Sequence, residues 1–139
     1  MTPHLTHVAL FVHDVGRTVE FYRRYAGLCV VHDRVDGGVR VAWLSERAVD
    51  PEFVIVAIQT TPGAPEVPPH MAHFGYDAGS RAAVDEVAGR AEADGLLVQG
   101  PLDAGPIVGY LCIIRDPDGN LVEFSHGQSI KPRQQPSEG

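Results

Sequence analysis

The sequence predicts an α+β protein made of two similar modules, each with the order strand, helix, strand, strand, strand. Its apolar and turn pattern begins again after a proline-rich segment, TPGAPEVPP. His7 and His73 open the two halves at matching places, and a glycine that can end a helix follows each of them at Gly27 and Gly95. We therefore expect one domain that comprises a first module at 1–60, a connector at 61–69, a second module at 70–127 and a disordered tail at 128–139.

The first half starts with an alternating strand at Leu5–His13, followed by a helix that Asp14 can cap and Gly27 can end. Val15, Val19 and Tyr22 form the apolar stripe of this helix. Three strands are expected after it, at Leu28–Arg34, Val39–Ser45 and Glu52–Thr60.

The second half repeats this order, with a strand at His70–Ala78 and a helix that Ser80 can cap and Gly95 can end. Its remaining strands are expected at Leu96–Gly100, Ile107–Ile114 and Leu121–His126. The last two flank the stretch 116–120, which reads DPDGN. Because proline presets φ and glycine accepts a positive φ, this stretch predicts a hairpin turn.

Composition restricts the partners. The 139 residues carry a formal net charge of −7, which argues against a nucleic-acid surface or an anionic membrane as a partner. No signal peptide and no apolar run long enough to span a bilayer are visible, so we expect a cytoplasmic protein. Cys29 and Cys112 lie in apolar runs and are expected to be reduced, buried thiols.

Strand alternation places three candidate metal ligands on one side of the modules. Each helix should cover one sheet face, and the residues expected beneath the helices are Val8, Leu10, Val12, Ala72, Phe74, Tyr76, Val122 and Phe124. His7, His73 and Glu123 then share the opposite, concave side. Two imidazoles and a carboxylate suit Zn, Fe, Ni, Mn or Co and leave coordination positions open. The alternative is that all three are ordinary polar strand residues.

The repeat also identifies a missing ligand. The offset between the halves places the first-half counterpart of Glu123 between Ile55 and Ala57, and strand parity favours Val56. A symmetric site would have a fourth ligand at this position, where valine offers none.

Three motifs, HVALFVHDVGRTVEFYRR, HFGYD and DPDGNLVEF, resemble those of the vicinal oxygen chelate superfamily, which contains glyoxalase I, methylmalonyl-CoA epimerase, extradiol dioxygenases, fosfomycin-resistance enzymes and bleomycin-binding proteins. The resemblance covers Leu5 to His126. It implies paired βαβββ modules that curve around a cavity, with a divalent metal held by His7, His73 and Glu123. It also implies a homodimer, because small members often complete their sites between chains.

The sequence departs from each familiar branch. Glyoxalase I and the epimerase carry Glu or Gln where this chain has Val56, extradiol dioxygenases carry a tyrosine at the place of Ile113, and fosfomycin-modifying enzymes carry a threonine at the place of Ala9. Bleomycin-type binders lack the three ligands altogether. The resemblance therefore predicts the fold more specifically than the activity.

Other residues are candidates for the cavity. Tyr110 follows a glycine-containing loop, so its phenol could donate a hydrogen bond or a proton to a substrate oxygen, although core packing is the alternative. The candidate catalytic residues are therefore Glu123 and Tyr110. The expected pocket residues are Phe11, Trp43, Val54, Val56 and Ile58.

These residues give two hypotheses of different classes. The first is a metal-dependent enzyme, of lyase, isomerase or dioxygenase type, that stabilises an oxyanion of a small oxygen-rich substrate by Lewis-acid chemistry. Its base is unassigned, with Glu123 or a metal-bound hydroxide as candidates. The second is a non-catalytic protein that binds an antibiotic or similar natural product, as in the bleomycin-resistance type.

Overall fold

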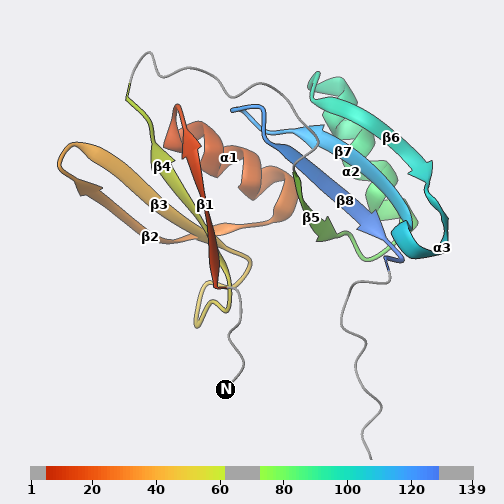
Figure 1. Ribbon diagram of the computed structural model, residues 1–139, viewed down its shortest axis with the longest axis horizontal. Coiled ribbons are helices and arrows are strands. Elements are labelled where there is room, and N and C mark those ends of the chain that lie inside the picture. The colour runs from red at the N-terminus through yellow and green to blue at the C-terminus, as the bar shows by residue number, and fades with distance from the viewer. Residues whose placement is uncertain (1–5, 62–72, 129–139) are drawn as a thin grey trace, which may run out of the picture. The chain divides into compact units, whose positions relative to one another are not determined.

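The computed structural model of the chain describes residues 6–61 and 73–128. The predicted connector from residue 62 on, the position of Ala72 and the predicted tail from residue 129 on lie outside these ranges. Contacts divide the chain into two compact units (Figure 1). Among the described residues, the first unit holds 6–61 together with 116–119, and the second holds 73–115 and 120–128. The expected modules are continuous stretches, whereas the first unit also takes in the tip of the late hairpin.

The first unit is a four-stranded sheet with one helix. Its elements are β1 (His7–Val12), α1 (Val15–Ala26), β2 (Cys29–Asp36), β3 (Val39–Ser45) and β4 (Val54–Gln59). The strands lie in the order β1-β4-β3-β2, with β1 parallel to β4 and the other pairs antiparallel.

The second unit repeats this topology. Its elements are β5 (His73–Asp77), α2 (Arg81–Ala93), β6 (Leu97–Asp103), α3 (Gly105–Val108), β7 (Tyr110–Arg115) and β8 (Leu121–His126). The strand order is β5-β8-β7-β6, with β5 parallel to β8. The predicted α+β class and the repeated βαβββ order are therefore confirmed.

One predicted strand began too early. Ile107 and Val108 belong to the short helix α3 rather than to a strand that runs from Ile107 to Ile114. Proline follows Gly105 in the first turn, where its missing N–H costs nothing, and Gly109 ends the helix by donating its N–H to the Gly105 carbonyl at 2.7 Å. The apolar run hid a helical turn because a short apolar stretch has no clear period.

The two long helices have the predicted N-terminal caps, and α1 ends at the predicted glycine. Asp14 and Ser80 cap them by accepting the backbone N–H of Arg17 and Ala83, respectively. Gly27 ends α1 in the left-handed conformation, with φ of 67°, which glycine adopts without a steric penalty. The α2 helix ends at Ala93, and Gly95 has the left-handed φ two residues later.

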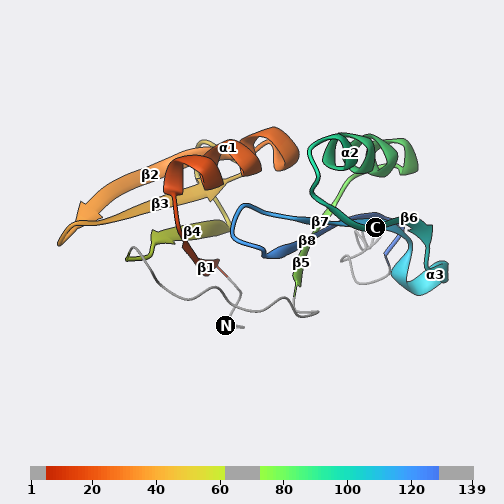
Figure 2. The ribbon, with the colours of Figure 1, turned by 90° about the horizontal axis from the view of Figure 1, so that it is seen from above.

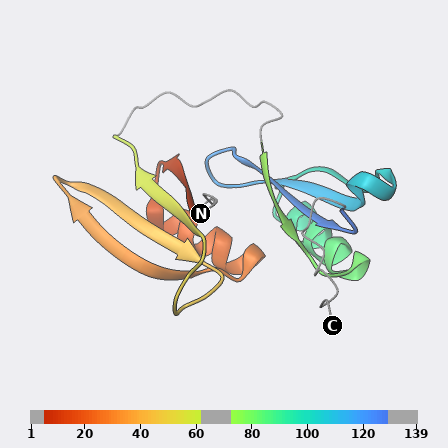
Figure 3. The ribbon, with the colours of Figure 1, turned by 60° about the horizontal axis from the view of Figure 1, so that its bottom comes forward.

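Each helix covers one face of its own sheet. The α1 helix packs on β2, β3 and β4, and α2 packs on β6, β7 and β8 (Figure 2). Val15 and Tyr22 are buried as predicted, Val19 is partly buried, and Thr18, Phe21 and Tyr25 are also buried. Within each unit, the long helix lies against a single face of its own sheet, so the other face of that sheet carries no long helix (Figure 3).

Candidate functional site

The open face of the second unit brings His73 and Glu123 together. In the parallel β5–β8 pair, His73 lies beside Leu121 and Gly75 lies beside Glu123. Because paired residues point the same way and alternate residues share a face, His73 and Glu123 lie on one face of neighbouring strands. Phe74, Val122 and Phe124 lie on the α2 side, as the alternation predicted.

The Glu123 carboxylate is buried and held in place. The residue is 7% exposed, and Gln128 Nε2 donates a hydrogen bond to Glu123 Oε2 at 2.8 Å. The neighbouring Gly75 leaves the room for this carboxylate, because a Cβ at Gly75 would lie 3.0 Å from Oε2. Gln128 was expected to lie in the disordered tail, so its contact with Glu123 was not predicted from the sequence. A polar amide soon after the strand that carries Glu123 was the only available signal.

His7 lies in the first unit. It is paired with Val54, is exposed, and has its Nδ1 3.0 Å from Thr6 Oγ1. A hollow of about 540 Å³ opens beside it on the face away from α1. Four of the five predicted pocket residues line this hollow together with His7, namely Trp43, Val54, Val56 and Ile58. The fifth, Phe11, lies on β1 like His7, is 72% exposed and is not part of the lining.

The strand registers define how the two units correspond. Ala9 lies beside Val56 on β1 and β4, just as Gly75 lies beside Glu123 on β5 and β8. Val56 therefore occupies in the first unit the place that Glu123 occupies in the second, as strand parity predicted. An isopropyl group there offers neither a ligand nor a base.

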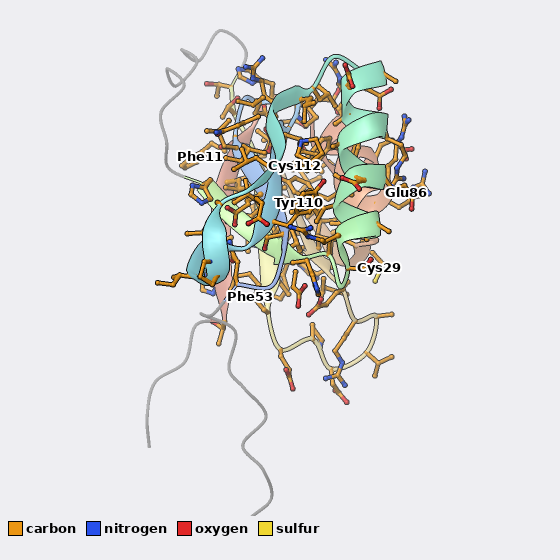
Figure 4. The ribbon with its side chains drawn as sticks, turned by 90° about the vertical axis from the view of Figure 1, so that its right-hand side faces the viewer. Phe11, Cys29, Phe53, Glu86, Tyr110 and Cys112 are labelled. Atoms are coloured by element: carbon orange, nitrogen blue, oxygen red, sulfur yellow. The ribbon has the colours of Figure 1, made fainter. Side chains whose placement is uncertain are left out.

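Tyr110 is not brought together with Glu123. Its hydroxyl donates to an oxygen of Asp85 on α2, and the Arg81 guanidinium lies 4.4 Å from the centre of its ring. Figure 4 shows Tyr110 and Cys112 beside α2. The hydrogen bond to Asp85 raises the pKa of Tyr110 above its ordinary value and so disfavours the phenolate. This arrangement fixes the start of β7 against α2.

The three predicted metal ligands are divided between the units. His7 belongs to the first unit, and His73 and Glu123 belong to the second. Across residues 6–61 and 73–128 of the chain, no group of three or more His, Cys, Asp and Glu side chains is placed to hold a metal ion. Imidazole and carboxylate together suit a divalent transition metal. Two of the three predicted donors, His73 and Glu123, lie on one face of the second unit.

No helix in the described part of the chain is long and apolar enough to cross a membrane.

Two βαβββ units, each with a histidine at the start of its first strand on the open sheet face, define the glyoxalase-like class of fold. The chain belongs to the Glyoxalase/Bleomycin resistance protein/Dioxygenase superfamily, whose family model matches residues 4–124.

Relatives of this chain differ in what is established about them. The uncharacterized protein PA2024 of Pseudomonas aeruginosa is 42% identical over 132 residues, which cover 95% of this chain and 94% of that protein. The fosfomycin resistance protein FosX of Listeria monocytogenes has a similar structure, with a TM-score of 0.75 at 18% identity over 93% of this chain and 97% of that one. FosX has also been crystallised with Mn(II). A possible glyoxalase of Bacillus cereus has a TM-score of 0.67 at 26% identity over 89% and 99% of the two chains.

Proposed function

We propose that this chain is a metal-dependent enzyme in which His7, His73 and Glu123 hold a divalent ion and a small oxygen-rich organic molecule is the substrate. The buried Glu123 carries this proposal. Burying a carboxylate costs free energy unless the group is bonded or bound to a metal. Glu123 lies between Gly75 and Ile113 on its sheet, and the side-chain amide of Gln128 donates a hydrogen bond to it. A carboxylate kept in this setting is typical of a functional group rather than a solvated one.

The surroundings of Glu123 support the same conclusion. Leu111, Ile113 and Leu121 form a buried apolar cluster, and strand alternation places them on the face that carries Glu123. Water is therefore excluded from part of this face, which strengthens any electrostatic interaction made there. The hydrogen bond from Gln128 fixes one carboxylate oxygen.

A divalent ion bound by these residues would supply a Lewis acid that polarises a substrate oxygen and stabilises negative charge on it. Glu123 and His73 would fix its position relative to the second unit, and Gly75 keeps the space beside the carboxylate free. The crystallisation of FosX with Mn(II) supports the use of a divalent metal within this fold.

Metal analysis tests the proposal. The chain is purified without added metal, and its content of Zn, Ni, Mn, Co and Fe is measured for wild type, Glu123→Gln and His73→Ala. We expect about one ion per wild-type chain and a loss in both variants. His126→Ala is the matched control, because this exposed histidine lies at the end of the same strand on the opposite face and should leave the metal content unchanged. Equal, substoichiometric metal in all four proteins would contradict the proposal.

A second function, binding without chemistry, is favoured by the apolar character of the first unit. Val56 replaces the ligand that a symmetric site would have, and the hollow around it is lined mainly by Ala9, Val54, Ile58 and Trp43. Thermal-shift measurements against divalent metals and against aromatic antibiotics separate the two functions, because a ligand stabilises only a protein that binds it. A shift with an antibiotic and none with any metal would favour the binder.

The homodimer is part of the same proposal. Small members of the superfamily often complete their sites between chains, and His7 belongs to a different unit from His73 and Glu123. A second copy is therefore a candidate source of His7.

A further inference from the structure

We infer that the hollow of the first unit binds a planar aromatic part of the substrate that carries a carboxylate or phenolate, with Trp43 against the ring and Arg34 at the anionic group. This inference rests on the proposed function in one respect, that His7, one of the three proposed metal ligands, lines the same hollow. It names the substrate class, which the metal ligands leave open.

Trp43 is an aromatic wall already held in position. It lies on β3 opposite Val56 of β4 and His32 of β2. Its ring centre is 4.7 Å from that of His32, and the guanidinium of Arg34 lies 5.8 Å from it. The side chain is nevertheless 36% exposed. The indole is partly exposed, and its two neighbours restrict its side-chain conformation. It can therefore contact a ligand ring with little loss of conformational entropy.

The floor of the hollow suits an apolar ring. Ala9, Val54, Val56 and Ile58 come from two neighbouring strands and present small or branched side chains to it. The volume of about 540 Å³ lies within the range of sites that hold small organic molecules. Aliphatic groups beside an indole favour an aromatic ring over a highly hydrated ligand.

Arg34 supplies the charge. Its Nε donates to Asp36 Oδ2 at 2.7 Å, and across the described parts of the chain no other acceptor is bonded to this guanidinium. A guanidinium has five N–H donors in a planar fork, so the Nη groups can bind a carboxylate or phenolate. Arg34 lines the same hollow as Trp43.

The acidic residue at the rim does not favour a cationic ligand. Glu52 also lines the hollow, but its side chain is 85% exposed and lies 3.4 Å from Arg47 Nη1. Solvent therefore screens the charge of Glu52 more than that of Arg34, whose side chain is 38% exposed. The guanidinium beside the indole is the charge that a ring-bearing ligand would meet first.

Calorimetric titration with three probes tests this inference, namely 2-naphthoate, the neutral 2-naphthalenemethanol and the non-aromatic cyclohexanecarboxylate. We expect 2-naphthoate to bind most tightly, since it alone has both the ring and the charge. Arg34→Gln should weaken 2-naphthoate about tenfold, the loss of one charge-assisted interaction, and leave 2-naphthalenemethanol unchanged. Trp43→Leu should weaken both aromatic probes about tenfold and leave cyclohexanecarboxylate unchanged.

Matched control variants separate these effects from general damage. Arg40→Gln removes an arginine of the same sheet that is paired with Asp33 and lies on the opposite face from Trp43. Phe53→Leu removes an aromatic residue of similar exposure, 37%, that does not line the hollow. Both should bind all three probes as wild type does.

The titrations are run in EDTA, so that probe binding is measured without bound metal. If the proposed function fails because the chain holds no metal, the results of these titrations do not change. Equal affinity for the three probes, an Arg34→Gln variant that binds 2-naphthoate as tightly as wild type, or no binding at millimolar concentration would each overturn the inference. None of these results would alter the metal content measured above.

Discussion

Glu123 and Val56 occupy equivalent positions in the two units, and they differ in what they can offer a ligand, a carboxylate in one unit and an isopropyl group in the other. Each lies on the last strand of its unit beside a small residue of the first, Gly75 for Glu123 and Ala9 for Val56. The unit with the carboxylate also has the smaller neighbour. The second unit is thus built for a polar group and the first for an apolar surface.

We predict that Gly75→Ala lowers the metal content of the protein while changing the free energy of unfolding by less than about 1 kcal/mol. The added methyl would lie 3.0 Å from Glu123 Oε2, which must move, and the carboxylate is the flexible end of a side chain. Metal analysis and chemical denaturation measure the two effects. Gly89→Ala, in the exposed interior of α2 with open space around it, should keep the metal and stabilise the protein by about 0.5–1 kcal/mol. Full metal content in Gly75→Ala would contradict the role given to this glycine.

Cys112 makes stability depend on pH in the alkaline range. Burial raises the pKa of its thiol from 9.0 to about 11. Between these values the unfolded chain loses the proton and the folded chain keeps it, so the free energy of unfolding falls as pH rises from about 9 to about 11. Below pH 9 both states are protonated and the contribution is fully present.

We predict that Cys112→Val has a shallower loss of stability than wild type over this range, as measured by denaturation at pH 8, 9, 10 and 10.5. Cys29→Ala serves as the control for the removal of a thiol, because Cys29 is only partly buried. Parallel curves for wild type and Cys112→Val would show that the thiol is not the cause.

At the scale of elements, the hairpin between β7 and β8 does more than reverse the chain. Its tip, residues 116–119, belongs to the first unit. Tyr22 on α1 donates its hydroxyl to Asp116 Oδ2 at 2.8 Å, and both residues are almost fully buried. His13 Nδ1 lies 2.6 Å from Asp118 Oδ1, and Thr18 Oγ1 donates to Asp118 Oδ2 at 3.4 Å. The DPDG sequence thus forms the turn, and its two aspartates also bond to side chains of α1 and of His13, which precedes α1.

We predict that Tyr22→Phe lowers the free energy of unfolding by about 1–3 kcal/mol, since it removes a donor from a buried carboxylate. A double-mutant cycle with Asp116→Asn, measured by chemical denaturation, isolates the interaction. Strictly additive losses would mean that the two side chains do not stabilise each other.

The helix caps give a prediction at the same scale. Ser80→Ala should cost about 1 kcal/mol, because the hydroxyl accepts the Ala83 N–H at 3.1 Å and that donor would lose its partner. Ser80→Asp should retain most of the stability, since aspartate is an equally good cap. An alanine variant as stable as wild type would indicate that water replaces the cap.

At the scale of the whole molecule, the three proposed ligands are divided between the two units, so the proposal can be tested for which copy supplies each ligand. We predict that co-expressing His7→Ala chains with Glu123→Gln chains, each with its own tag, gives a purified heterodimer with about one metal ion. If His7 comes from the other copy, one site combines both mutated ligands and the other combines both intact ones. If all ligands come from one chain, every site lacks a ligand and the heterodimer should hold none. A monomer in solution would contradict the dimer itself.

The fold was largely predictable from local signals. Asp14, Gly27 and Ser80 mark helix ends through their own hydrogen bonds or their own φ, which depend on neighbouring residues. Strand alternation predicted the sheet face on which His7 and His73 lie and the correspondence of Val56 to Glu123, because the side-chain period of a strand does not depend on the rest of the fold. Ile107 and Val108 were assigned wrongly because four residues are too few to show a period.

The sequence by itself determined the repeated βαβββ order and the faces of the strands, since both follow from periodicity and from capping and turn residues. Only the tertiary structure decided which side chains meet across the chain. It placed Gln128 on Glu123, turned Tyr110 toward Asp85, and joined the DPDG tip to α1. The physical reason is that these contacts depend on side chains brought together from separate elements, and no local pattern specifies such a contact.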